Sequence, residues 1–207
     1  LSPAHVRLAQ EMLLPPPPPA ELIGRGAEMD RLAAAIGAGR LALVEGAGKT
    51  ALLRQLADDS RIRRSFKRIW WLDDLRDALT RLGVALDAPN LLIAEAHEAA
   101  APLREHLTET NTLLIVDSTE GLDNGAEWLF AVAPYVVVGR SGVAALPHLP
   151  NPIRVTLSGL PEDEAVRWLM ALSRQPETII RPLCALVEHH PNAIRLLAAM
   201  MTEDGLP

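Results

Sequence analysis

The feature that most constrains the fold is a glycine-rich turn that directly follows an apolar run. Residues 41–44 (LALV) are apolar, and the motif GAGKT occupies residues 46–50. Such a turn between a strand and a helix points several backbone N–H groups at one place, where the helix dipole adds partial positive charge. The lysine suits the β- and γ-phosphates, and the threonine hydroxyl suits Mg²⁺. The pattern predicts a phosphate-binding P-loop, and hence a nucleotide site.

The predicted loop is short. The usual pattern has four residues between its first glycine and the Gly-Lys pair, whereas only Ala47 separates Gly46 from Gly48 here, so about three residues are missing. Either the loop is degenerate, or the natural protein contains residues that the printed sequence lacks. We favour the second alternative because an empty phosphate loop is mobile. Lys49 itself is not an indifferent choice, because among 20 basic residues only Lys49 and Lys67 are lysines.

Composition indicates a compact α/β protein. The chain has 207 residues, 49% of them hydrophobic and 3% aromatic, enough for one α/β domain and a small second one. Its single cysteine, Cys184, excludes an internal disulfide, and no signal peptide or membrane-length apolar run is present, so we expect a cytoplasmic protein with no membrane contact. The net charge of −6 argues against general nucleic-acid binding. Basic residues gather between positions 61 and 68, where a solvated turn is the simpler explanation.

Local patterns divide the chain into three parts. Residues 1–20 combine a helix over 3–13, capped by Ser2, with a polyproline II spacer over Pro15–Pro19 that suits an interdomain linker after an upstream domain. Residues 21–157 form the nucleotide-binding domain, and residues 158–207 form a helical lid. Helices are expected at 27–37, 49–58, 74–82 and 92–107, and strands at 41–45, 68–73, 112–117, 135–139 and 153–157.

The alternation of strands and helices predicts an α/β fold with a parallel sheet covered by helices on both faces. From Pro161 onward the pattern is helical, with a break near Pro176 and restarts at Pro182 and Pro191. The adjacent His189 and His190 do not form a zinc site, because no cysteine has ligand spacing to them.

The strand at 112–117 ends in Asp117. We expect this strand to lie next to the P-loop strand, so that the carboxylate holds the water shell of Mg²⁺, as in a Walker B strand. The alternative is that Asp117 only caps the following turn. Ser118 stands where many hydrolytic P-loop proteins place a second acid, and Glu120 is either its substitute or a first-turn acid of the helix that contains Trp128. Fast hydrolysis is therefore not expected.

Taken in order, further motifs resemble a known family. They are Ile23-Gly24-Arg25, Val138-Gly139-Arg140-Ser141, Gly159-Leu160-Pro161 and His190-Pro191-Asn192-Ala193-Ile194, around the P-loop and Asp117. Over residues 21 to about 203 the chain resembles the NB-ARC module of STAND-class ATPases, a switch found in apoptosome scaffolds, plant disease-resistance proteins and bacterial regulators, and a bacterial source is favoured. The resemblance implies an AAA-like P-loop NTPase sheet with a lid, ADP or ATP and Mg²⁺ as cofactors, and slow ATPase activity that drives conformational change.

The resemblance also implies site residues. Lys49, Asp117 and Arg140 would be catalytic, with Arg140 sensing the γ-phosphate, and Thr50 and Asp117 would hold the metal. Nucleotide contacts would come from Ile23, Gly24, Arg25, Gly46, Gly48, Lys49, Thr50, Ala51 and Pro191. Ile23 and Arg25 would lie over adenine and phosphates, and Pro191 would pack on adenine. Each residue also has a structural explanation: a turn for Gly24-Arg25, a strand end for Arg140, a helix start for Pro191.

Partners implied by the resemblance are an upstream effector, downstream winged-helix and sensor domains, and further copies of the chain in an activated homo-oligomer; nucleic acid would be contacted only through a domain not present here. Two other classes stay open. One is a conventional P-loop or AAA+ ATPase with fast turnover, against which Ser118 argues. The other is a degenerate scaffold module that no longer binds nucleotide, and a nucleotide titration separates the two.

Overall fold

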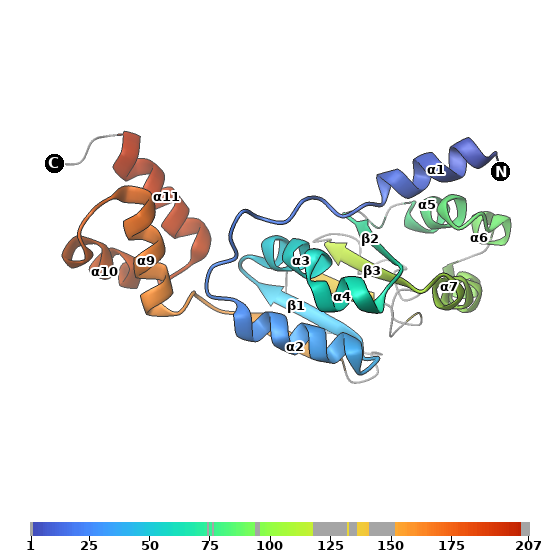
Figure 1. Ribbon diagram of the computed structural model, residues 1–207, viewed down its shortest axis with the longest axis horizontal. Helices are drawn as coiled ribbons and strands as arrows, with labels where there is room; N and C mark the ends of the chain where they lie inside the picture. Colours follow the sequence, from blue (N-terminus) through green and yellow to red (C-terminus); the bar gives the residue numbers. More distant parts are fainter. Residues whose placement is uncertain are drawn as a thin grey trace.

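The computed structural model describes residues 2–73, 75, 77–93, 96–117, 132, 136–140 and 152–203. Its central part is a sheet with helices around it, and three further helices lie beyond the end of the last strand (Figure 1). The helices and strands are α1 (Pro3–Met12), α2 (Gly26–Gly37), β1 (Ala42–Gly46), α3 (Lys49–Asp58), α4 (Ser60–Ser65), β2 (Arg68–Leu72), α5 (Ala78–Ala85), α6 (Pro89–Ile93), α7 (Ala96–Thr110), β3 (Thr112–Asp117), β4 (Val136–Arg140), β5 (Ile153–Leu157), α9 (Glu162–Ser173), α10 (Glu177–Leu186) and α11 (Pro191–Glu203).

The five strands form one parallel sheet in the order β2-β3-β4-β1-β5. This confirms the predicted parallel α/β fold, in which the carboxyl ends of all strands meet at one edge. The expectation that the Asp117 strand is a neighbour of β1 is wrong. Strand β4 lies between them, with Gly139 paired to Val44 on one side and to Asp117 on the other. Hydrophobic periodicity identifies strands but carries no information about their order.

Alternate residues of each strand supply two separate cores. On β1, Leu43 packs with α5–α7, whereas Ala42 and Val44 pack with α2, α3 and α4. The two adjacent tryptophans of β2 divide in the same way, because Trp70 joins the first core and Trp71 the second. Successive side chains of a strand point to opposite faces, so strands buried on both faces read as continuous apolar runs.

Helix α1 and the proline segment lie along the sheet part. Ser2 caps α1 by accepting a hydrogen bond from the His5 N–H, as predicted. Leu13 is fully buried in the first core, and its carbonyl accepts a hydrogen bond from the Trp71 N–H at 2.7 Å. The proline segment 15–19 then runs from α1 toward α2 (Figure 1). The N-terminal helix is therefore fastened to the edge strand β2.

Some helix boundaries differ from the sequence-based expectation. The helix expected at 74–82 begins at Ala78, because Asp77 at its N-cap has φ 54°, which a right-handed helix does not admit. The helix expected at 92–107 is two helices, α6 and α7. Three residues of the basic cluster, Arg61, Arg63 and Arg64, lie on helix α4, which Asp59 caps, whereas Lys67 precedes β2 and Arg68 begins it.

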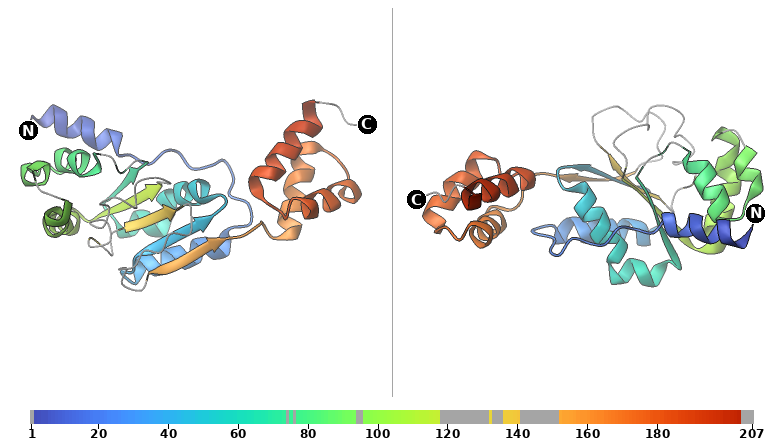
Figure 2. Two further views of the ribbon diagram at one scale, coloured as in Figure 1. Left: turned by 180° about the vertical axis from the view of Figure 1, so that it is seen from behind. Right: turned by 90° about the horizontal axis from the view of Figure 1, so that it is seen from above.

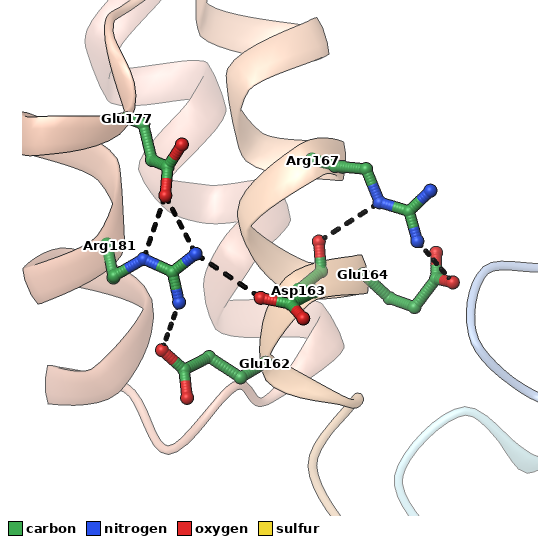
Figure 3. Close-up of polar contacts among 6 residues, drawn as sticks. All are labelled: Glu162, Asp163, Glu164, Arg167, Glu177 and Arg181. Atoms are coloured by element: carbon green, nitrogen blue, oxygen red, sulfur yellow. Dashed lines mark hydrogen bonds and ion pairs between the residues drawn. The ribbon is translucent and has the colours of Figure 1, made fainter.

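Helices α9–α11, here called the lid, have a core of their own around Leu169, Ile180 and Ile194. Figure 3 shows the polar contacts on one side of the lid, where Arg181 of α10 bonds to Glu177 and to Glu162 and Asp163 of α9. The predicted restart at Pro182 is wrong, since α10 runs through it. The proline removes one backbone hydrogen bond, and the burial of Ile180 and Cys184 in the lid core stabilises the helix on both sides of it. The start at Pro191 is confirmed.

Among the described residues, none of the helices has the length and the apolar composition required to span a bilayer.

Candidate functional site

The connection between β1 and α3 consists of only two residues, Ala47 and Gly48. Gly46 ends the strand with φ 102°, and a Cβ there would lie 2.1 Å from the Leu157 carbonyl oxygen, so the position requires glycine. Gly48 caps α3 with φ 91°. The helix therefore starts at Lys49, and the unpaired N–H groups of its first turn face the carboxyl edge of the sheet.

Lys49 folds back over this turn. Its ammonium group donates a hydrogen bond to the Gly46 carbonyl at 3.1 Å. Thr50 is exposed beside it. The carboxylate nearest in sequence, Glu45, is directed to the neighbouring strand, where Arg154 Nη1 lies 3.2 Å from its Oε1. Glu45 is thus paired with a neighbouring strand rather than directed over the turn.

A cavity of about 680 Å³ opens over this turn. Its size falls in the range of small-ligand sites. The lining residues come from the turn and α3, from the proline segment and from the lid: Pro19, Gly46, Ala47, Gly48, Lys49, Thr50, Ala51, Arg54, His190, Asn192 and Arg195. Three of them are lysine or arginine and none is acidic, in a chain whose net charge is −6. An excess of one sign in a concave site attracts the opposite charge, so the cavity is suited to a polyanion.

Asp117 lies at the same sheet edge but does not line the cavity. Since β4 intervenes, two strand spacings of about 4.8 Å separate its backbone from β1. Gly139 on β4 keeps the space between Asp117 and α3 open. A Cβ on Gly139 would lie 3.2 Å from Asp117 Oδ1 and 2.6 Å from Leu53 Cδ1 of α3.

Residues 23–25 lie at the junction between the sheet part and the lid. Arg25 is only 4% exposed, and its guanidinium donates to the Ser158 carbonyl at 2.6 Å and to Glu28 Oε1 at 3.0 Å. Gly24 packs against Pro161 at the start of α9, and Ile23 packs against the lid core. None of the three lines the cavity.

The structure thus brings together part of the predicted site. Gly46, Gly48, Lys49, Thr50 and Ala51 share one cavity. Pro191 of the lid lies near the turn without lining the cavity: its Cγ is 3.9 Å from the place that a Cβ on Gly48 would occupy. The backbone of Arg140 pairs with Glu45. The Arg140 side chain, Ser118, Glu120, Trp128 and Ser141 lie outside the described residues.

Sequence reasoning missed Pro19, Arg54 and Arg195 as cavity residues. Each arginine lies about one helical turn after the start of its helix, a position that many ordinary surface arginines also occupy. Only the fold places them in one cavity.

Mg²⁺ is compatible with this arrangement. Within the described residues no group of three or more His, Cys, Asp or Glu side chains is placed to hold a metal ion. Mg²⁺ at nucleotide sites is typically held by the phosphates, waters and one or two protein oxygens rather than by a protein cage. Thr50 and Asp117 can supply such oxygens at this edge.

Comparison with solved structures identifies the fold. Over 89% of the chain, the structure resembles a Signal Transduction ATPase with Numerous Domains (STAND) protein with a tetratricopeptide repeat sensor from Pyrococcus horikoshii, with a TM-score of 0.64 and 18% sequence identity. It also resembles a Walker-type ATPase of Pyrococcus abyssi over 93% of the chain, with a TM-score of 0.62 and 15% identity. No protein-family model and no curated protein matches the chain.

These likenesses show that the chain shares the fold of these two ATPases, with a parallel sheet and helices as predicted. The chain spans 31% of the length of the P. horikoshii protein and 71% of the P. abyssi protein.

Proposed function

We propose that the chain is the nucleotide-binding core of a signalling switch of the STAND class, of NB-ARC type, that binds ADP or Mg-ATP in the cavity over the β1–α3 turn. The observation that carries this proposal is the cavity itself, which joins the GKT turn and its lysine to two arginines, with no acidic residue in the lining. The likeness to a STAND protein supports the class.

Within the proposed site, each group has a distinct task. The first-turn N–H groups of α3 and the Lys49 ammonium hold phosphate oxygens, and Lys49 exchanges its bond to the Gly46 carbonyl for them. Thr50 and Asp117 offer oxygens to Mg²⁺, which neutralises phosphate charge when bound. Arg140 at the end of β4 is proposed to sense the γ-phosphate.

The residues 158–203 are proposed to act as a lid whose position depends on the nucleotide. A ligand shifts a conformational equilibrium only through its different affinity for the two states. The cavity is lined by residues of both the β1–α3 turn and the lid. A nucleotide that contacts both would therefore bind more tightly when the lid lies against the turn than when it lies away from it. Oligomerisation, an upstream effector and downstream winged-helix and sensor domains belong to the same proposal.

Calorimetric titration with ADP tests the proposal. We expect Lys49→Ala to weaken binding of both ADP and ATP at least about tenfold, the equivalent of one charge-assisted hydrogen bond. Lys67→Ala is the matched control, since it removes the other lysine of the chain, which is exposed just before β2. Failure of the wild type to bind either nucleotide would overturn the proposal.

That negative result would favour a scaffold module, which the two-residue turn makes the second candidate. The intact mass of the natural protein separates the causes. We expect about three further residues between Val44 and Lys49, as the usual loop pattern requires. A mass that matches the printed residues alone would show that the short turn is native, and weak nucleotide binding would then follow.

Two properties of the proposed site concern base and turnover. We expect ADP to bind more tightly than GDP, because the backbone near Ile23 would pair with adenine and leave the groups of guanine unpaired. Equal affinities for ADP and GDP would show that the backbone near Ile23 does not contact the base.

We expect hydrolysis slower than about one turnover per second, because Ser118 replaces the second acid. Faster turnover would favour a conventional ATPase.

A further inference from the structure

The cavity has two walls that come from different parts of the chain. One wall is the β1–α3 turn with Arg54 of α3, and the other is the lid, through His190, Asn192 and Arg195. The lid lies beyond the end of β5, apart from the body of the sheet (Figure 2). Any ligand that touches both walls therefore fastens the lid to the sheet.

The basic side chains of both walls carry unused hydrogen-bonding capacity. Arg195 makes no hydrogen bond or ion pair with any described residue. The buried Nε of Arg54 likewise has no hydrogen-bond partner among the described residues. In contrast, the lid arginines Arg167 and Arg181 are paired with carboxylates (Figure 3). A buried donor without a partner is costly, and like charges in one cavity repel each other. A polyanion relieves both costs.

The position of Pro191 near the turn indicates which end of α11 lies at the cavity. Pro191 begins α11, and its Cγ lies 3.9 Å from the place that a Cβ on Gly48 would occupy, so the start of α11 lies near the turn. Arg195 follows one helical turn later, about 6 Å along the helix axis. The start of α11 is therefore near the turn, and Arg195 lines the cavity that the turn borders.

We propose that Arg195 is the phosphate ligand of the lid, and that the phosphate chain, more than the base, couples the lid to the β1–α3 turn. This inference rests on the proposed nucleotide function and specifies how the nucleotide acts on the lid. A guanidinium binds phosphate oxygens in a bidentate, charge-assisted manner. Each added phosphate charge strengthens the attraction, so ATP holds the lid more firmly than ADP.

The test compares wild type with Arg195→Ala and Arg195→Lys, with Arg167→Ala as the control. Arg167 is another exposed lid arginine, it pairs with Glu164, and it does not line the cavity. Calorimetry measures binding of ADP, ATP and inorganic tripolyphosphate, which has no base. We expect Arg195→Ala to weaken binding of ADP about tenfold and binding of ATP and tripolyphosphate more, with partial rescue by lysine and no effect of Arg167→Ala.

Hydrogen exchange gives a readout that does not depend on affinity. Tripolyphosphate at saturating concentration is expected to slow amide exchange in α11 of the wild type and not in Arg195→Ala. Because Arg195 is exposed, its variants should keep the wild-type Tm.

Three outcomes would overturn the inference. Unchanged affinities of Arg195→Ala for all ligands would remove Arg195 from the site. Protection of α11 by ADP but not by tripolyphosphate would show that the base fastens the lid. If the wild type binds no nucleotide, the nucleotide function itself fails, and a failure of that kind is distinguished by the wild-type titration alone.

Discussion

Replacing Arg25 with alanine separates two roles for this side chain. In the structure, Arg25 joins the start of α2 to the segment that leads from β5 into the lid, through the Ser158 carbonyl and Glu28. The family resemblance instead implies contact with phosphates. A structural role affects stability without nucleotide, whereas a phosphate contact affects only nucleotide affinity.

The expected loss of stability follows from the two bonds. A hydrogen bond to a charged group contributes about 1.5–3 kcal/mol. Ser158 is exposed and Glu28 is 16% exposed, so water partly replaces the lost arginine at both partners. Taking the lower figure for each bond gives about 3 kcal/mol, which corresponds to a decrease in Tm of about 6–12 °C for a chain of this size.

Urea unfolding and thermal unfolding without nucleotide measure this effect. Arg25→Lys keeps the positive charge but can make only one of the two hydrogen bonds. About half of the loss in unfolding free energy is therefore expected. Arg167→Ala is the control, because its pair with Glu164 is exposed and contributes at most about 1 kcal/mol. If Arg25→Ala unfolds within about 0.5 kcal/mol of wild type and yet loses ADP affinity, the structural role is refuted and the phosphate role is supported.

Three further predictions concern the edge of the sheet and the lid. Gly46→Ala forces a side chain against the Leu157 carbonyl at positive φ, and we expect a loss of more than about 2 kcal/mol in urea unfolding. Gly139→Val crowds Asp117 and Leu53 of α3, and we expect the free energy of unfolding to decrease by about 1–3 kcal/mol. A stability equal to wild type would show that α3 shifts without cost. Burial raises the pKa of the Cys184 thiol, so labelling by a thiol reagent should require unfolding of the lid. Since the unfolded thiol ionises first, stability of the lid should fall as pH rises above about 8.5; rapid labelling of the native protein would contradict this.

The sequence predicted strands more accurately than their arrangement. The strands at 112–117 and 153–157 were predicted with their observed bounds, because each is a short run of β-branched and apolar residues between polar ones. Their order was not predictable from local patterns, since β4 reaches its place between β1 and β3 through contacts distant in sequence. The same limit explains the error about the position of Asp117.

The site shows a similar division. The β1–α3 turn was identifiable because its chemistry lies within five consecutive residues, 46–50. Arg54 and Arg195 lie far apart in the chain, and neither has a local pattern that distinguishes it from other arginines. Pro182 shows a different limit, because a proline disfavours the helix locally, whereas the packing of Ile180 and Cys184 in the lid core stabilises α10 around it.

The hydrogen bond between Leu13 and Trp71 has a consequence for solubility. Strand β2 stands at the edge of the sheet, and an exposed edge can recruit strands of other molecules into aggregates. The segment around Leu13 occupies one outward N–H of this edge, and the prolines that follow have no N–H with which to extend a ladder. The N-terminal segment therefore protects the sheet against intermolecular pairing, and its removal should allow the protein to self-associate through β2.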